Sequence, residues 1–306
     1  MSKEVRGSVL VIVAGLAWGL SGVCGQYLMT QGFPPLILTN IRILLAGFFL
    51  ILIAYGTARE SFLAILKDSK SLLGVFLFGI LGLLLNQLSY LLAIHETNAG
   101  TATVLQYVCP ILVLAYSCLR SRRWPSLVEL VAIVLASLGT FLIATHGQLA
   151  SLSITPLGLF WGLFSAVTYA LYILLPIKLI QRFGSISIIG LGMFLGGLVL
   201  TPFSGLLSFS WPWSGQTFLA LLGLVGLGTI FTYTVFLKGA SLIGPIKSSL
   251  LASIEPVAAV VFTFFIMQDS FYLIDLVGMV LILGAVSLIS LKDLFLQEKR
   301  KRDKAG

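Results

Sequence analysis

Two ionisable residues lie inside long apolar runs of the sequence, where a charge is costly. Glu255 directly precedes Pro256, and Arg42 lies in the outer part of another run. A carboxylate in such a place must be paired, hydrated or protonated, so Glu255 could take up a proton for coupling, bind a cationic group of a solute, or cap the backbone freed at Pro256. Arg42 could extend to the membrane interface, contact an acidic partner or bind a solute carboxylate.

Aromatic and polar side chains recur at helical spacing in several other apolar runs. Such groups must face protein or water, because exposing them to lipid is costly. Aromatic walls with a few amides and hydroxyls suit a solute with an apolar or cationic body and a polar end, so we expect them to converge on one cavity. Packing between helices is the alternative for each residue taken singly. The candidate binding residues are Trp18, Gln87, Tyr90, Tyr107, Trp161, Tyr169 and Tyr233.

Pro110 and Pro256 each interrupt an apolar run well inside its ends. A proline inside a helix removes one backbone hydrogen bond and favours a kink. We interpret the pair as hinges, since paired helix breaks border the solute site in transporters with inverted repeats. The alternative is that each proline only curves a packed membrane helix.

Residue patterns typical of catalysis or metal binding do not occur in this sequence. The three cysteines lie within apolar runs and have no metal-ligand spacing, and the two histidines, His95 and His146, fall in predicted loops. There is no Ser/His/Asp or HExxH arrangement and no GxxxxGK[ST] phosphate loop. We therefore expect no catalytic residue, no metal and no cofactor, and the alternative of a membrane-embedded enzyme is disfavoured.

The composition indicates that membrane helices position these residues. Of the 306 residues, 58% are apolar and 10% are charged, and the mean hydropathy is +1.07. A soluble domain of this size needs more polar surface to cover its core. A run of about 20 apolar residues crosses a bilayer as a helix, which satisfies its backbone groups internally. Ten such runs are predicted, at 7–29, 36–55, 72–93, 98–119, 126–145, 157–175, 186–207, 216–240, 246–266 and 271–292.

The basic residues alternate between successive gaps of this ten-span pattern. Of the 19 basic residues, Arg42 lies inside a span and all others fall at one side of the membrane. Cytoplasmic loops carry the excess of Lys and Arg, so both termini are predicted to be cytoplasmic in a multi-pass protein of the cytoplasmic membrane. The net charge of +8 therefore reflects topology rather than a nucleic-acid partner.

The sequence contains an internal repeat. GLAWGL at Gly15–Leu20 is matched by GLFWGL at Gly158–Leu163, and YVCPILVLAY from Tyr107 is matched by SIEPVAAVVF from Ser253, at nearly the same offset. Each half holds five spans, an odd number, so the second half enters the membrane in the opposite orientation. Such inverted repeats suit alternating access around a site near the membrane midplane. The predicted repeats are 1–147 and 148–306.

Three features carry a family resemblance: the paired GLxWGL motifs, NIRILLAGFF at Asn40–Phe49, and LLASIEPVAAVVFTFF from Leu250 followed by LVGMVLILGAVSLI from Leu276. With these motifs the chain resembles the EamA-type branch of the drug/metabolite transporter superfamily. The resemblance implies an all-α permease of ten helices in two inverted EamA repeats. An acidic residue before this proline is common in that family, which favours a structural role for Glu255. Where the family often has a Gly-Glu-Arg-like turn, this chain has RSRRWPS and MQDSFYL.

These patterns predict a secondary carrier that moves a small organic metabolite by alternating access. The resemblance favours export of an amino-acid-like or amphipathic solute. Uptake of a quaternary amine is the alternative, because Trp and Tyr side chains suit a cationic body. The expected partners are the solute and membrane lipid, with protons as the candidate coupling ion. The sequence does not encode the oligomeric state.

Overall fold

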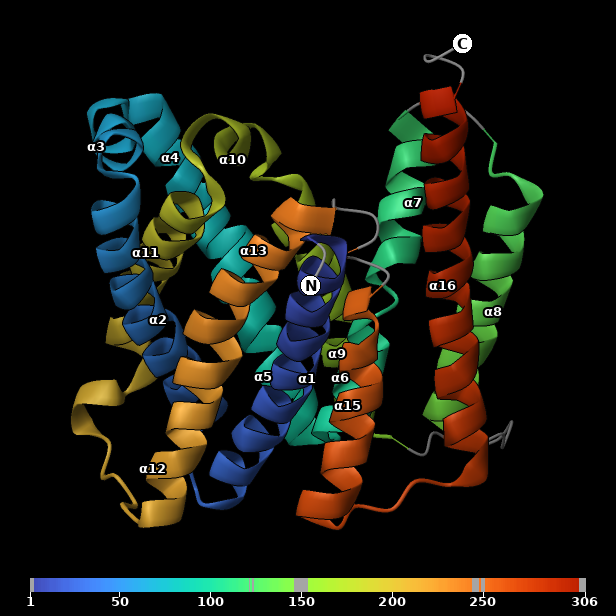
Figure 1. Cartoon of the computed structure of the whole chain (residues 1–306). Helices are drawn as coiled ribbons and strands as arrows, with labels where there is room; N and C mark the ends of the chain where they lie inside the picture. The colour runs from blue at the N-terminus through green and yellow to red at the C-terminus, as the bar shows by residue number, and fades with distance from the viewer. Residues whose placement is uncertain are drawn as a thin grey trace.

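The computed structural model describes residues 3–120, 122, 124–145, 154–243, 248 and 251–302. These described residues form helices and connecting segments, without a strand among them (Figure 1). The all-α prediction is therefore confirmed for this part of the chain. The helices of the first half are α1 (Lys3–Thr30), α2 (Pro35–Thr57), α3 (Arg59–Lys67), α4 (Ser69–Phe78), η1 (Gly79–Leu84), α5 (Leu85–Glu96), α6 (Ala99–Gln106), α7 (Cys109–Arg120) and α8 (Leu127–Thr145).

The second half continues the same pattern of long helices interrupted by short irregular turns. A short helix, α10, lies between α9 and α11, as α3 lies between α2 and α4. The helices are α9 (Pro156–Leu174), α10 (Ile177–Phe183), α11 (Ser185–Ser204), η2 (Leu206–Ser208), α12 (Gly215–Leu221), η3 (Leu222–Phe231), α13 (Thr232–Ile243), α15 (Ile254–Phe262), η4 (Thr263–Met267) and α16 (Leu273–Arg302).

Seven helical segments in the described part of the chain are long and apolar enough to cross a membrane. Three shorter apolar helices, Leu127–Ile143, Ile254–Met267 and Leu273–Leu288, overlap the remaining predicted runs. The start of the predicted run 246–266 lies partly outside the described residues. The chain is thus a multi-pass membrane protein, while ten crossings and cytoplasmic termini stay predictions.

Two helices that hold matching places in the repeats begin with the same side-chain cap. At the start of α8, Glu129 Oε2 accepts a hydrogen bond from Ser126 N at 2.7 Å. At the start of α16, Asp275 Oδ2 accepts one from Tyr272 N at 3.0 Å. A carboxylate in the first turn satisfies exposed backbone donors and complements the helix dipole. The duplication therefore extends to the local chemistry of helix initiation.

The packing of the helices is reciprocal between the two halves. Helix α1 packs against α13 and α15 of the second half, and α9 packs against α5 and α6 of the first. In the same way α2 packs on α11 and α8 packs on α16. Figure 1 shows α1 in the middle of the bundle, with α2 and α11 at one end and α8 and α16 at the other. This arrangement places the predicted site residues of both halves around α1 and α9.

Glycines of the paired GLxWGL motifs allow two close approaches between the halves. A Cβ atom at Gly19 would lie 2.8 Å from Ala259 N and 2.9 Å from Glu255 O, on the backbone of α15. A Cβ atom at Gly162 would lie 2.6 Å from Leu105 Cδ1, on α6. Small residues let membrane helices approach closely. The two glycines therefore allow α1 to pack closely on α15, which carries Glu255, and α9 to pack closely on α6.

Candidate functional site

The helices that contain Pro110 and Pro256 both break just before these prolines. A turn at Tyr107 and Val108 separates α6 from α7, and a turn at Ser253 precedes α15. Because proline has no N–H, the carbonyl four residues earlier loses its helical donor. In the second break this is the carbonyl of Ala252. The kinks predicted from the prolines are thus present as turns, and their role as hinges stays a proposal.

Tyr107 of the first break satisfies the carbonyl freed in the second break. Its hydroxyl lies 3.0 Å from Ala252 O and 3.0 Å from Glu255 Oε2. A phenol has one proton, so it can donate to one of these oxygens at a time. A protonated Glu255 can instead donate to the Tyr107 oxygen, which then donates to Ala252 O, so that both hydrogen bonds form. Protonation of Glu255 would therefore let both hydrogen bonds form at the same time.

Arg42 is buried on α2 and is held through one edge of its guanidinium. The residue is 4% exposed, and its Nε donates to Thr229 Oγ1 on η3 at 2.9 Å. Its Nη1 is buried and has no hydrogen-bond partner. Among the residues that the structure describes, no ion pair includes Arg42 or Glu255, although the two lie within electrostatic reach of each other.

Aromatic rings from α1, α9 and α13 form a continuous series near these charges, which we name the ring series. The Trp18 and Tyr233 rings meet edge to face at 5.6 Å between centroids. Tyr172 contacts Tyr233 at 6.4 Å and stacks on Tyr169 at 5.7 Å. Tyr169 and Tyr233 both lie within electrostatic reach of Glu255. The structure therefore brings three of the predicted binding residues, Trp18, Tyr169 and Tyr233, into one aromatic wall.

Tyr90 and Gln87 lie buried on α5. The Tyr90 hydroxyl lies 2.7 Å from Thr103 Oγ1 on α6, and Tyr90 is within electrostatic reach of both Arg42 and Glu255. The structure gives Gln87 no hydrogen bond to another described residue. Both side chains therefore lie in the interior, as predicted, and Tyr90 belongs to the surroundings of the two charges.

Trp161 lies apart from the ring series. Its ring contacts Phe160 at 5.0 Å and Phe164 at 6.0 Å, all on α9, and it packs on the hydrophobic cluster that contains Tyr90. Trp161 thus holds the place in the second half that Trp18 holds in the first, without the corresponding ring partner. The sequence motif is duplicated, whereas its aromatic environment is not.

The sequence patterns did not predict a pair of hydrogen bonds near the C-terminal end of α1. Gln26 accepts a hydrogen bond from Ala99 N, at the start of α6, at 2.8 Å, and donates to Asp269 Oδ2 at 2.7 Å. Gln26 lies two helical turns beyond Trp18, a spacing that places both on similar faces of α1. That spacing could have marked Gln26 as a residue that faces the interior, but only the fold identifies its hydrogen-bond partners.

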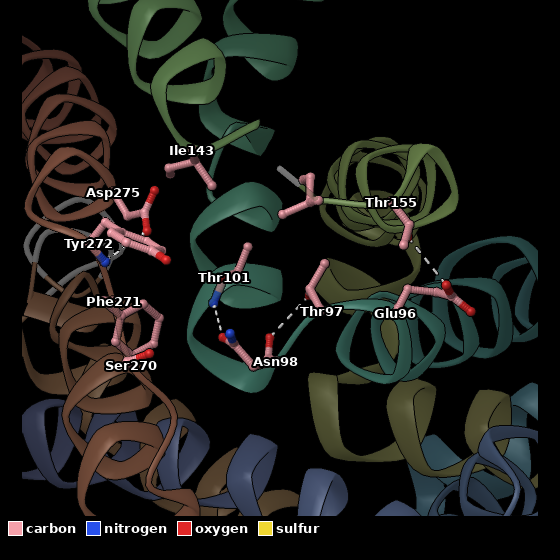
Figure 2. Close-up of a pocket in the computed structure, with 11 residues that line it drawn as sticks. Glu96, Thr97, Asn98, Thr101, Ile143, Thr155, Ser270, Phe271, Tyr272 and Asp275 are labelled. Atoms are coloured by element: carbon pink, nitrogen blue, oxygen red, sulfur yellow. Dashed lines mark hydrogen bonds between the residues drawn. The ribbon is translucent and has the colours of Figure 1, made fainter. Parts of the chain in front are cut away.

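A cavity of about 280 Å³ opens at the same end of the molecule and contains none of the predicted binding residues. Figure 2 shows the ends of α5 and α8, the start of α6 and the segment before α16 around it. Polar side chains dominate its wall. The lining residues are Glu96, Thr97, Asn98, Thr101, Ile143, Ile154, Thr155, Ser270, Phe271, Tyr272 and Asp275.

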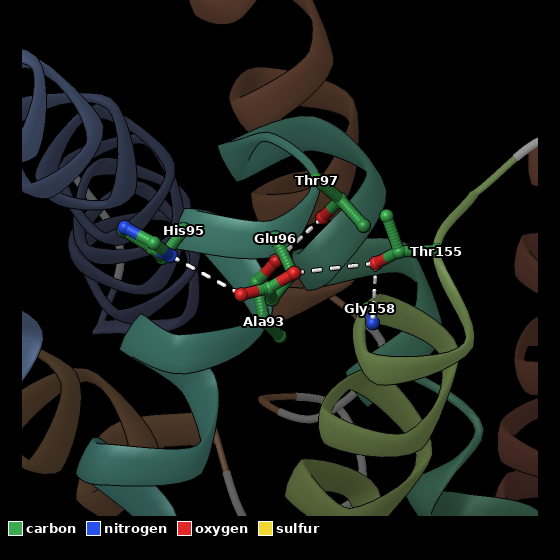
Figure 3. Close-up of polar contacts among 6 residues, drawn as sticks. All are labelled: Ala93, His95, Glu96, Thr97, Thr155 and Gly158. Carbon is green, nitrogen blue, oxygen red and sulfur yellow. Dashed lines mark hydrogen bonds and ion pairs between the residues drawn. The ribbon is translucent and has the colours of Figure 1, made fainter.

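Glu96 at the edge of this cavity connects the two halves. It accepts a hydrogen bond from Thr155 Oγ1 at 3.3 Å, and Thr155 Oγ1 in turn accepts one from Gly158 N at 2.9 Å, at the start of α9 (Figure 3). His95 Nδ1 lies 3.3 Å from Glu96 Oε1. The sequence predicts His95 in a loop, whereas the structure places His95 and Glu96 at the end of α5. His95 is exposed there, and Glu96 contacts Thr155 of the second repeat.

The family of the chain follows from two matched segments. The EamA-like transporter family matches at residues 5–145 and again at 156–291. The chain belongs to the EamA-like transporter family. The two matches correspond to the duplication seen in the sequence and to the reciprocal packing of its helices. This membership confirms the resemblance on which the transport prediction depends.

Similar proteins carry transporter names. The chain is 39% identical to the "uncharacterized inner membrane transporter YicL" of Salmonella typhimurium, over all of both chains. It is 27% identical to an "uncharacterized transporter" of Archaeoglobus fulgidus, covering 72% of this chain and 76% of the relative. YetK of Bacillus subtilis is 23% identical over 95% of this chain and 88% of its own. The protein is therefore a membrane transporter and not an enzyme.

A solved structure shares the fold. It is titled "Crystal structure of protein" and superposes with a TM-score of 0.64 at 16% identity, covering 96% of this chain and 99% of its own. At that identity the likeness concerns the fold alone.

Proposed function

We propose that the protein is a secondary carrier, which moves a small organic solute between its two repeats by alternating access. The solute is amino-acid-like or amphipathic, and the direction is export across the cytoplasmic membrane. The observation that carries the proposal is the presence of two ionisable side chains, Arg42 and Glu255, buried in apolar helices and without an ion pair among the residues that the structure describes. Ionisable residues at such depth are costly and mark solute or ion pathways.

The surroundings of these charges support a solute site rather than a purely structural pair. The ring series, with Trp18, Tyr169 and Tyr233, lies beside Glu255. Aromatic walls with a small number of placed polar groups bind the apolar body and the polar end of small solutes. Because Arg42 and Glu255 are not paired with each other, each retains bonding capacity for a ligand.

Alternating access is supported by the arrangement of the repeats. Helix α1 carries Gly19 against α15, and α9 carries Gly162 against α6, so each repeat places a glycine of its GLxWGL motif tightly against the other repeat. Near these contacts the breaks before Pro110 and Pro256 interrupt the helix ladder. In inverted-repeat carriers, one repeat rocks against the other around such a site.

Protons are the proposed coupling ion. Glu255 shares the Tyr107 hydroxyl with Ala252 O, and the two hydrogen bonds form together when Glu255 carries a proton. A proton or a cationic group of the solute that reaches Glu255 therefore acts directly on the break before Pro256. The ten-span topology with cytoplasmic termini gives this site access to both sides in turn.

A second candidate function, uptake of a quaternary amine, is favoured by the ring series. A cation over the faces of Trp and Tyr rings is attracted by their quadrupoles, and Glu255 adds a carboxylate nearby. This candidate uses the same residues but leaves Arg42 without a ligand.

Solute flux into proteoliposomes tests the proposal. Amino acids, quaternary amines and lipophilic cations are compared with and without a pH gradient, using the wild type, Glu255→Gln and the exposed control Glu60→Gln. We expect saturable flux of one class, a dependence of that flux on the pH gradient, and loss of this dependence in Glu255→Gln alone. Absence of saturable flux for every class contradicts the carrier, and an unchanged pH profile in Glu255→Gln contradicts proton coupling.

A further inference from the structure

We propose that Arg42 is the subsite for a carboxylate group of the transported solute. The inference rests on the proposed function and names the chemistry of one end of its solute. Its basis is the buried Nη1 of Arg42 on α2, which has no hydrogen-bond partner among the described residues.

The orientation of Arg42 is fixed before a ligand arrives. Thr229 Oγ1 donates to Leu224 O at 3.1 Å, which directs the lone pairs of the Thr229 oxygen toward Arg42 Nε, 2.9 Å away. The wide turn of the π-helix η3 makes this possible, because Thr229 reaches the carbonyl five residues earlier. The Nε of the guanidinium is therefore occupied, whereas its terminal nitrogen Nη1 has no hydrogen-bond partner among the described residues.

A terminal nitrogen of Arg42 lacks a hydrogen-bond partner in the part of the chain that the structure describes. Nη1 is buried and makes no hydrogen bond, and a buried donor without an acceptor costs the full desolvation of that group. Arg42 is 4% exposed, so bulk water does not cover it. The carboxylate that lies within electrostatic reach, Glu255, is bonded to Tyr107 instead. An anionic group from outside the chain is what this nitrogen lacks.

The geometry favours a carboxylate over other anions. The two terminal nitrogens of a guanidinium match the two oxygens of a carboxylate in parallel hydrogen bonds. A doubly charged phosphate would need further cations, whereas the groups that act electrostatically on Arg42 in the described part of the chain include Tyr233, Tyr90, Glu255 and Cys24, and none of these four is basic. One positive charge therefore balances one carboxylate.

Arg42 and Glu255 together fix the direction in which such a solute lies. A carboxylate at Arg42 leaves the remainder of the solute beside the ring series, and a cationic group at its other end faces Glu255. The site is thus complementary to a zwitterion with an apolar body, and Arg42 distinguishes it from an amine that lacks the carboxylate.

Matched solutes test the subsite directly. Wild-type protein in proteoliposomes is supplied with L-leucine, L-leucine methyl ester and L-leucinol, and with L-phenylalanine and its ester and alcohol. We expect half-saturation for the carboxylate forms about ten- to a hundredfold below that for the esters and alcohols, as for hydrogen bonds to a charged group. The same series is measured for Arg42→Lys, Arg42→Gln and Thr229→Val, with the exposed Arg59→Lys as control.

The variants separate the subsite from folding and from transport itself. Arg42→Lys keeps the positive charge but removes the planar guanidinium that can bind both carboxylate oxygens at once. We therefore expect this variant to lose most of the carboxylate preference at normal protein yield. Thr229→Val removes the partner of Nε and should reduce the preference by a smaller factor, while Arg59→Lys retains it. Saturable flux of esters or alcohols without a preference for carboxylates overturns the subsite and leaves transport standing. A full preference in Arg42→Lys and Arg42→Gln also overturns it, and absence of flux for every probe overturns the subsite and the proposed function together.

Discussion

The helix breaks before Pro110 and Pro256 share a position in the repeat and differ in chemistry. In the first, the residue before the proline is Cys109, a buried thiol without charge; in the second it is Glu255. The first break supplies Tyr107, whose hydroxyl crosses to the second break and satisfies its carbonyl. Duplication therefore produced two similar backbone interruptions, and divergence placed the ionisable group in one and its hydrogen-bond partner in the other.

Under the proposed function, this difference would let a carrier built from two similar repeats hold an asymmetric solute. Two identical breaks would present the same chemical group to both ends of a ligand. Here only the second break carries a charged group, Glu255 on α15, and the opposite charge comes from Arg42 on α2. The reciprocal packing of α1 and α9 preserves the scaffold on which alternating access is proposed to depend. In the proposed carrier, these charges set the chemistry of the solute.

Among the variants considered, we expect Tyr107→Phe to have the largest effect, a loss of transport. The change removes the donor to Ala252 O and the contact with Glu255 together, and we expect transport to fall by roughly tenfold or more, as for loss of a buried hydrogen bond to a charged group. Flux per folded protein in proteoliposomes measures it. Tyr27→Phe, which removes an exposed hydroxyl bonded to Gln216, is the matched control, and equal flux in both variants would show that the link between the breaks is dispensable.

Replacing the two prolines is expected to reduce transport by intermediate amounts, which differ between Pro256 and Pro110. Pro256→Ala restores an N–H that competes with Tyr107 for Ala252 O, so we expect a several-fold loss of transport and a changed pH dependence. Pro110→Ala restores an N–H beside Cys109, where no ionisable partner is involved, so the loss should be smaller and the pH dependence unchanged. Flux at matched protein yield, measured across pH, compares them. Full activity in both variants would assign the prolines to curvature alone.

The smallest effect, a change in thermal stability, is expected from removing the contact between Asp68 and Arg182. This solvated contact also joins the two halves. The hydrogen bond from Ser71 is the main cause that holds the pKa of Asp68 below its ordinary value, and Arg182, at 3.1 Å, adds to it. A lowered pKa means that this stabilisation is present above the ordinary pKa and is lost as the pH falls through the lowered one. The pair is exposed, so Asp68→Asn should change the thermal midpoint little at neutral pH, as thermal unfolding in detergent would measure. A large drop would make this surface contact, rather than the breaks, the main connection between the halves.

Much of the fold was predictable because its signals are local. The apolar runs, the repeated GLxWGL motif and the two prolines appear in the sequence, and the family match confirms the two-repeat transporter that they indicate. Helical spacing also identified Trp18, Tyr169 and Tyr233, since a polar or aromatic stripe shows which face of a helix avoids lipid. The same spacing suggested Trp161, which the structure places among Phe160 and Phe164, away from the ring series.

The sequence by itself determined that Arg42 and Glu255 are costly charges within apolar helices, because composition and hydropathy reveal a misplaced charge without its surroundings. Only the tertiary structure decided their partners. Arg42 meets Thr229, and Tyr107 meets Glu255 and the Ala252 carbonyl, across separations of more than a hundred residues. Periodicity fixes the face of each helix, whereas the partner on that face depends on how the helices cross and where their ladders break.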